Sequence, residues 1–233
     1  MRMPIFKALA ELFYPPLCVH CISRLSVSAE IALCFKCFGA LKRFVPEWEN
    51  EGGLRYYPNL KPAVASLNAL WYFEKQKPVQ SLLEELKYRS NTIVAHQLSK
   101  LLSMAFKEVY SLDTPEAIVP VPISAKRMRE RGYNQSELLA VQLSNALGIP
   151  VLKNALYRNE HQSQTRFNRA SRLKNSEDLF VLKNGQGLRE RRILILDDVC
   201  TTGSTLEALI RAMEAAKPQK IDVLVLAITP SPV

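Results

Sequence analysis

The stretch RRILILDDVCTTGST, residues 191–205, decides how the rest of the chain can be arranged. Four consecutive apolar residues, Ile193 to Leu196, predict a strand that is buried on both faces. Two adjacent carboxylates, Asp197 and Asp198, follow at the C-terminal end of that strand. A helix with an apolar face then begins near Leu206. Between them lie five small residues: Thr201, Thr202, Gly203, Ser204 and Thr205.

A strand, a hydroxyl-rich loop and a helix N-terminus together predict an anion site. Unpaired backbone N–H groups and the positive end of the helix dipole point at whatever binds there, and phosphate suits both. The chain contains neither the GxxxxGK[ST] loop nor the GxGxxG fingerprint. Because two carboxylates would repel a bare phosphate, they should face sugar hydroxyls or a hydrated Mg²⁺, and a phosphorylated sugar satisfies both needs. The alternative is a capped strand–helix connection with solvated aspartates.

This strand, acidic pair and hydroxyl loop resemble the phosphoribosyl pyrophosphate (PRPP) loop of the type I phosphoribosyltransferases. In that family the acidic pair holds the ribose 2′- and 3′-hydroxyls, and the hydroxyl loop wraps the 5′-phosphate. The resemblance therefore implies that Asp197 and Asp198 are the catalytic acids and that Thr201 to Thr205 bind the phosphate of PRPP. It also implies Mg²⁺ as the ion that accompanies PRPP.

The composition predicts a globular protein of one or two domains. The chain has 233 residues, of which 48% are hydrophobic, and no run of 18 uncharged apolar residues that could span a membrane. Near the N-terminus, Lys7 and Glu11 interrupt any signal-peptide core. We therefore expect the protein in the cytoplasm.

The positive charge is concentrated in one part of the sequence. The chain has a formal net charge of +9, and residues 122–174 alone hold ten Lys and Arg against three Glu. Such a concentration predicts a polyanionic partner. Pyrophosphate and nucleic acid both fit that description, and charge alone does not separate them.

Two CxxC pairs near the N-terminus predict a metal site. They consist of Cys18 and Cys21, then Cys34 and Cys37. Four thiolates at this spacing can surround a structural Zn²⁺, and so short a segment lacks the core to fold firmly without one. An iron–sulfur centre is the main alternative, whereas two disulfides suit a reducing compartment poorly. We expect His20 to be solvated or outside the ligand set, and Cys200 to be a small apolar filler.

The order of apolar segments predicts two domains, a zinc-binding module at residues 1–60 and an α/β domain at residues 61–233. The stretch 46–62, rich in Pro and Gly, is expected to be a linker or an irregular tail of the first module. In the second domain the continuous apolar runs alternate with helical patterns, which is typical of a parallel sheet. Strands are expected at 63–73, 117–121, 150–152, 193–196 and 221–228, and helices at 79–89, 93–110, 135–147 and 206–217.

A cationic turn follows the strand expected at 117–121. Lys126, Arg127 and Arg129 lie in it, and the C-terminal ends of strands in open α/β sheets are where ligands collect. We therefore expect these three residues to bind pyrophosphate. The alternative is a solvated basic face. The polar, basic segment 157–176 shows no periodicity, so it is expected to be a functional or disordered loop.

Four stretches together are similar to the ComF competence family. They are the CxxC pairs, Leu86-Lys87-Tyr88-Arg89, the block from Val119 to Gln135, and the PRPP loop. The segment 164–175 resembles the mobile loop of that family. The resemblance implies a type I phosphoribosyltransferase-like parallel sheet flanked by helices, with a small N-terminal zinc-ribbon-like module.

The resemblance also implies a function in natural transformation, namely the uptake and cytoplasmic handling of single-stranded DNA beside a competence helicase. Arg166, Arg169 and Arg172 would then be the mobile-loop residues that contact DNA. Type I relatives include regulators that bind PRPP without turning it over, so the fold implies catalysis without guaranteeing it. The alternative is a DNA-uptake adaptor with a vestigial PRPP pocket, which binds DNA and a helicase partner without catalysis.

Overall fold

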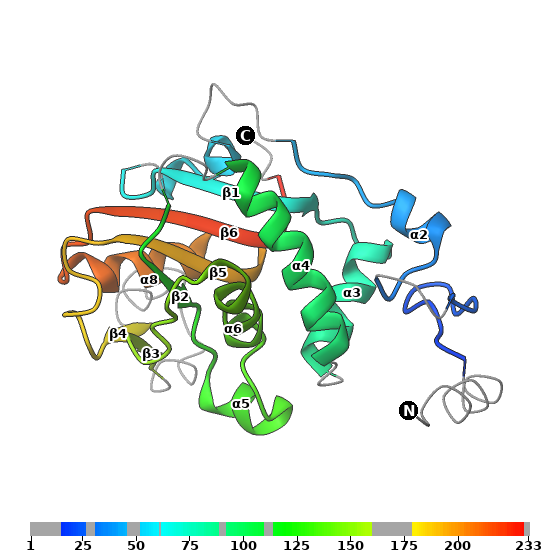
Figure 1. Ribbon diagram of the computed structural model, residues 1–233. Coiled ribbons are helices and arrows are strands. Elements are labelled where there is room, and N and C mark those ends of the chain that lie inside the picture. The colour runs from blue at the N-terminus through cyan, green and yellow to red at the C-terminus, as the bar shows by residue number, and fades with distance from the viewer. Residues whose placement is uncertain are drawn as a thin grey trace, which may run out of the picture.

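A four-stranded parallel sheet forms the centre of the protein (Figure 1). The structure is a computed structural model, and it describes residues 15–26, 31–45, 52–60, 62–88, 92–109, 114–159 and 179–230. Across the sheet the order of strands is β1 (Ser66–Tyr72), β6 (Lys220–Ile228), β5 (Arg192–Cys200) and β2 (Ala117–Pro120). All three neighbouring pairs run parallel, which confirms the sheet expected from the apolar runs.

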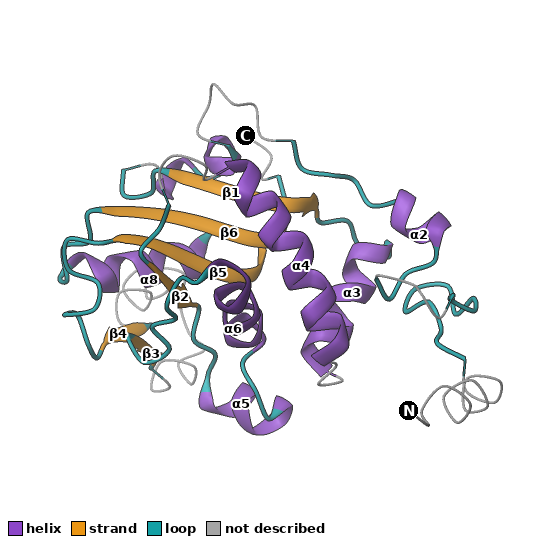
Figure 2. Cartoon of the chain, in the orientation of Figure 1, coloured by secondary structure: helices purple, strands orange, loops and turns teal. Residues whose placement is uncertain are grey.

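Helices cover both faces of the sheet (Figure 2). One face is covered by α3 (Pro78–Tyr88), α4 (Thr92–Val109) and α6 (Gln135–Leu147). The other is covered by α8 (Ser204–Glu214) and by an antiparallel pair, β3 (Leu156–Arg158) and β4 (Phe180–Leu182). The remaining elements are α2 (Phe35–Gly39), α5 (Ala125–Arg131) and two 3₁₀ turns, η1 (Gly53–Tyr56) and η2 (Pro58–Leu60).

Strand β5 is buried on both faces, as its unbroken apolar run predicts. Ile193 and Ile195 belong to the core under α8, whereas Leu194 and Leu196 belong to the core under α3, α4 and α6. All four side chains are fully buried. Since successive side chains of a strand point to opposite faces, a central strand between two helical layers needs apolar residues at every position.

The prediction that residues 46–62 form a linker is wrong for residues 52–60, which pack in the core of the α/β domain. Leu54, Tyr57 and Leu60 are buried in the same core as the inner strands of the sheet. Gly53 allows this close approach, because a Cβ atom there would lie 2.5 Å from Cδ1 of Ile228. The glycines that looked like linker residues are therefore needed for packing.

Two further expectations about the sheet need correction. Residues 150–152 form no strand, and Val151 makes an isolated bridge to Ile118 instead. The β3–β4 pair was not predicted, because three residues per strand are too few to show a period of two. The pair matters for the site because β3 ends just before the polar segment and β4 begins just after it.

The cysteine-containing part packs against the helical layer. Cys18, Cys37 and Leu41 share one buried cluster with apolar residues of α3 and α4. The division at residue 60 stays a prediction, and packing contacts cross it on both sides of the sheet. None of the described helices is long and apolar enough to cross a membrane.

Candidate functional site

The acidic pair lies where β5 extends beyond its neighbour β2. The last residue of β2, Pro120, is opposite Leu196, while Asp197 remains paired with Val225 of β6. The two carboxylates therefore occupy a step at the C-terminal edge of the sheet. Strand β5 continues to Cys200, four residues after Leu196, so the acids are part of the strand and not of the loop after it.

Asp197 is held by the N-terminus of α6. Its Oδ1 accepts hydrogen bonds from Ser136 Oγ at 2.8 Å and from the backbone N–H of Asp198 at 2.9 Å. Asn134 caps α6, and its side chain donates to the carbonyl of Val121 just after β2. The turn between α5 and α6 is thereby tied to the end of β2, and the helix that begins there places the Ser136 hydroxyl against the first acid of the pair.

Burial changes the acidity of Asp197. The side chain is almost fully enclosed, and burial together with the neighbouring charge of Asp198 raises its pKa to about 7. The hydrogen bonds from Ser136 and Asp198 and the charge of Lys87 act in the opposite direction. An acid with such a pKa changes its charge near neutral pH, which is common at binding and catalytic sites.

The stability of the ligand-free protein should consequently fall as pH rises from about 4 to about 7. The folded pKa of Asp197 lies above its unfolded value near 4, so its contribution is fully present below pH 4 and is lost as pH rises through 7. The loss is on the order of a few kcal/mol. Melting curves across this range, compared with those of Asp197→Asn, measure it. An equally steep decline in the variant would contradict the assignment.

Asp198 points to the other face of the sheet and meets a lysine. Its Oδ2 lies 2.8 Å from Nζ of Lys87, at the C-terminal end of α3. The sequence pattern did not place Lys87 in the site, although it belongs to the Leu86-Lys87-Tyr88-Arg89 stretch. A helix that ends in a basic residue is ordinary, so only the fold reveals this contact.

The hydroxyl loop leads directly into helix α8. Gly203 has φ +75° and forms the N-cap, and the helix begins at Ser204. Thr202 Oγ1 lies 2.9 Å from Ser204 Oγ, so the two hydroxyls form a local hydrogen bond. Thr201, Thr202 and Ser204 are exposed. The predicted arrangement of small hydroxyl residues at a helix N-terminus is therefore present and accessible.

Tyr57 contacts the start of this loop through its hydroxyl and its ring. No pattern in the sequence indicated this role. Its hydroxyl donates to the backbone carbonyls around the loop, with oxygens of Cys200 at 3.0 Å and Thr201 at 3.2 Å, and the oxygen of Thr229 is also in contact. A Cβ atom at Gly203 would lie 2.9 Å from the Tyr57 ring. Burial raises the pKa of Tyr57, so its hydroxyl stays protonated and remains a donor.

The three predicted pyrophosphate residues lie on helix α5. Lys126, Arg127 and Arg129 are exposed, and Lys126 forms a 3.9 Å pair with Glu130 of the same helix. Burial lowers the pKa of Arg158 on β3, the charge of Arg127 lowers it further, and the charge of Asp197 raises it. The charges of Arg127 and Asp197 therefore both act on Arg158.

The predicted mobile-loop residues Arg166, Arg169 and Arg172 lie outside the described residues. The described ends of that segment are β3 and β4, which pair in register from Leu156 with Leu182 to Arg158 with Phe180. The Arg158 guanidinium lies 5.5 Å from the centre of the Phe180 ring. These two described ends belong to the core on the face of the sheet that α8 covers.

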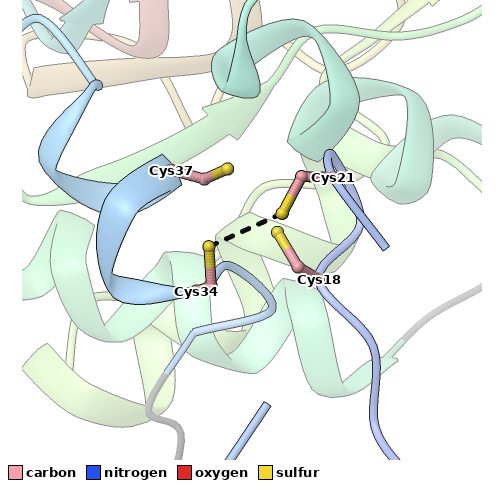
Figure 3. Close-up of side chains that lie close together, drawn as sticks. All are labelled: Cys18, Cys21, Cys34 and Cys37. Carbon is pink, nitrogen blue, oxygen red and sulfur yellow. Dashed lines mark hydrogen bonds between the residues drawn. The ribbon is translucent and has the colours of Figure 1, made fainter. Parts of the chain in front are cut away.

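The four cysteines converge in the N-terminal part (Figure 3). Their sulfur atoms all lie within 4.8 Å of one another, with 3.6 Å between those of Cys21 and Cys34. Four sulfurs bound to a tetrahedral Zn²⁺ at about 2.3 Å would lie about 3.8 Å apart, so the cluster fits a metal of this kind. None of the four is in a disulfide. They are Cys18, Cys21, Cys34 and Cys37.

The surroundings of the cluster favour thiolates on its exposed side. Hydrogen bonding from Ser23 lowers the pKa of Cys21 to about 6, whereas burial raises the pKa of Cys37. His20 is directed away from the sulfurs, because its Nδ1 lies 3.0 Å from Oγ of Ser81 on α3. Within the described residues, this cluster is also the one group of three or more ligating side chains close enough to hold a metal.

Comparison with known proteins finds similarity to a phosphoribosyl transferase domain and to proteins named for competence or DNA utilization. The family model described as phosphoribosyl transferase domain matches residues 133–232. Competence protein F of Haemophilus influenzae is 33% identical over 225 residues, which covers 90% of this chain and 96% of that protein. DNA utilization protein YhgH of Escherichia coli (strain K12) is 33% identical over 133 residues, which covers 55% of this chain and 58% of that protein.

Among solved structures, a purine phosphoribosyltransferase from Pyrococcus horikoshii Ot3 aligns with a TM-score of 0.40 and 22% sequence identity. That alignment covers 58% of this chain and 74% of the other. The similarity to the Haemophilus protein, in contrast, extends over almost the whole of both chains.

Proposed function

Because the chain belongs to the ComF family of competence proteins, we propose that it binds PRPP with Mg²⁺ and acts in natural transformation, in the uptake and cytoplasmic handling of single-stranded DNA. The observation that supports PRPP most strongly is the order of groups along β5 and α8. Two buried carboxylates are followed within three residues by an accessible hydroxyl loop at a helix N-terminus. A phosphorylated ribose presents its hydroxyls and its phosphate in that same order.

In this proposal each part of the site has its own task. Asp197 and Asp198 accept hydrogen bonds from the ribose 2′- and 3′-hydroxyls. The residues Thr201 to Thr205 donate backbone and hydroxyl hydrogen bonds to the 5′-phosphate. Tyr57 binds the carbonyls of Cys200 and Thr201 and so fixes the start of that loop. Lys126, Arg127 and Arg129 receive the pyrophosphate group.

The described residues suggest how Mg²⁺ would be held. No group of three carboxylates lies near the acidic pair in the described part of the chain. Mg²⁺ keeps several waters and is commonly bound through substrate phosphates with one or two carboxylates, so the ion would arrive with PRPP. When bound, it neutralises charge on the pyrophosphate. A transfer reaction breaks the bond between C1 of the ribose and pyrophosphate, and α5 would stabilise the leaving group.

For the N-terminal cluster we propose one structural Zn²⁺, bound by the four cysteines. All four coordination positions would be protein thiolates, which leaves no open position for chemistry. The exposed cations of α5 and the concentration of charge at 122–174 favour a second role, the binding of single-stranded DNA and of a competence helicase partner. In the adaptor alternative this second role is the whole function, and the PRPP pocket is vestigial.

PRPP with Mg²⁺ should raise the melting temperature by about 5 to 10 °C at a hundred times its dissociation constant. Binding to the folded state alone stabilises by roughly 2.7 kcal/mol at that concentration. The shift should vanish in Asp197→Asn/Asp198→Asn. Asp222→Asn is the matched control, because Asp222 is also buried in the sheet and accepts from Ser66 Oγ at 2.6 Å, but lies on β6 away from the loop. A parent protein without any shift would contradict PRPP binding.

A further inference from the structure

Lys87 connects helix α3 to the acidic pair. Its Nζ lies 2.8 Å from Oδ2 of Asp198, with 22% of the lysine side chain and 6% of the aspartate side chain exposed. This pair differs from another close pair between distant segments, Lys42 with Glu74, whose lysine side chain is 66% exposed. An ion pair shielded from water interacts strongly, and loss of one partner leaves a buried charge behind.

The position of Lys87 is fixed by the fold around it. The preceding residue, Leu86, is fully buried, and its carbonyl accepts a hydrogen bond from the hydroxyl of Tyr133. Tyr133 immediately precedes Asn134, which caps α6. The same turn therefore holds Lys87 on one side and presents Ser136 to Asp197 on the other.

A cation from α3, Lys87, offsets negative charge at the acidic pair. Asp197 and Asp198 are adjacent and buried, and the charge of Asp198 disfavours the ionised form of Asp197. The charged groups that face them are Lys87 from α3 and Arg158 from β3. Arg158 influences Asp197, whereas Lys87 is in direct contact with Asp198. Lys87 therefore acts on both acids, by direct contact with Asp198 and through its charge on Asp197.

We propose that Lys87 is a positioning residue of the PRPP site, which holds the Asp198 carboxylate by a direct ion pair so that it is oriented toward the ribose hydroxyls. The proposal rests on the proposed function, and it assigns part of the site to a helix outside the strand, loop and helix that carry the PRPP motif. Lys87 does not have to touch PRPP for this role. Its effect on the ligand is transmitted through Asp198.

The test uses full-length variants and two measurements. Lys87→Met removes the charge and keeps most of the side-chain stem, and Lys87→Arg keeps the charge. Lys42→Met is the matched control, because it breaks an ion pair of similar length at an exposed position. The first measurement is the affinity for Mg²⁺-PRPP by calorimetry, and the second is melting at pH 5 and at pH 8 without ligand.

Lys87→Met should bind Mg²⁺-PRPP at least about tenfold more weakly than the parent, since hydrogen bonds to a correctly held charged group contribute at least that factor. Lys87→Arg should recover part of the loss, and Lys42→Met should bind like the parent. Without ligand, the drop in melting temperature of Lys87→Met should be larger at pH 8 than at pH 5, because Asp197, whose pKa is about 7, is charged beside the unpaired Asp198 at pH 8 and protonated at pH 5. A folded Lys87→Met with an affinity within twofold of the parent would overturn the proposal.

A further variant covers the case in which Lys87→Met does not fold. Lys87→Met/Asp198→Asn removes both charges, so it should melt higher than Lys87→Met at pH 8 and still fail to bind Mg²⁺-PRPP. Recovery of binding in this double variant would contradict the role of Asp198 and hence that of Lys87. If the parent itself does not bind PRPP, the proposed function fails. The positioning of Asp198 is then decided by melting, and equal melting temperatures of the single and double variants at pH 8 overturn it.

Discussion

Removal of the metal from the four-cysteine cluster should lower the melting temperature of the whole protein by more than about 10 °C. Structural Zn²⁺ stabilises isolated zinc-finger peptides by about 10 kcal/mol or more, and each kcal/mol corresponds to about 3 °C in a chain of this size. The effect should reach beyond the cluster, because Cys18 and Cys37 share a buried cluster with Leu82 and Leu86 of α3. Loss of the metal removes one wall of that core.

The measurement combines elemental analysis with melting. Protein purified without oxygen should contain one zinc per chain, and Cys18→Ser/Cys37→Ser should contain none and melt lower. Cys200→Ser is the matched control for metal content, because Cys200 is equally buried and lies outside the cluster. Iron with sulfide in the parent would replace the zinc assignment by an iron–sulfur centre. A main melting transition that is unchanged without metal would contradict the shared core.

The sheet could be predicted from the sequence because its strands carry strong, local signals. Ile193 to Leu196 and the run from Ile221 to Ile228 are unbroken apolar segments, and both became central strands, β5 and β6. Helix α6 was predicted at its observed bounds, since Asn134 caps it and Gly148 ends it. Where burial on both faces and capping residues agree, the sequence alone determines the element.

Elements whose packing depends on distant residues could not be predicted in this way. The stretch 52–60 looks like a linker by its glycines, and only the nearby β1 and β6 explain why those glycines are there. Tyr57 gave no local signal, because its task is to bind carbonyls of residues about 140 positions further along the chain. Such contacts depend on the three-dimensional arrangement, which no short pattern contains.

In the candidate site, too, some residues could be predicted from the sequence and others could not. The motif predicted Asp197, Asp198 and the hydroxyl loop, which the structure brings together at one edge of the sheet. The groups that orient the two acids, Ser136 and Lys87, come from α6 and α3 and lie 61 and 111 residues before them in the sequence. A motif therefore identifies the groups that meet the ligand, whereas the supporting groups become visible only in the fold.

The acidic pair and the hydroxyl loop also allow a prediction about natural transformation in the cell. A scaffold that only binds DNA and a partner would fold as well with apolar residues at the end of β5 and an ordinary N-cap on α8. Here two buried acids are retained, and the cost in stability of ionising Asp197 grows as pH rises toward neutral. We therefore expect transformation by added DNA to require an intact PRPP loop.

The test replaces Thr202 and Thr205 by Val, which removes two hydroxyls at nearly constant volume. Each lost hydrogen bond to a charged phosphate corresponds to about 1.5 to 3 kcal/mol, so PRPP affinity should fall by roughly two to four orders of magnitude. In a transformable host that lacks its own ComF-family protein, transformation should fall by orders of magnitude relative to the parent. Thr114→Val is the control, because Thr114 is exposed ahead of β2 at the opposite edge of the sheet.

Binding of single-stranded DNA in vitro should persist in Thr202→Val/Thr205→Val, because the basic surface is unchanged and such binding depends chiefly on phosphate contacts. Its salt dependence should match that of the parent, whereas replacing Arg166, Arg169 and Arg172 by Ala should make the dependence shallower. A loop variant that melts like the parent, fails to bind PRPP and still transforms at the parental level would establish the adaptor alternative. In that case the cations at 122–174 carry the function, and the two acids at the end of β5 are a remnant of an ancestral enzyme.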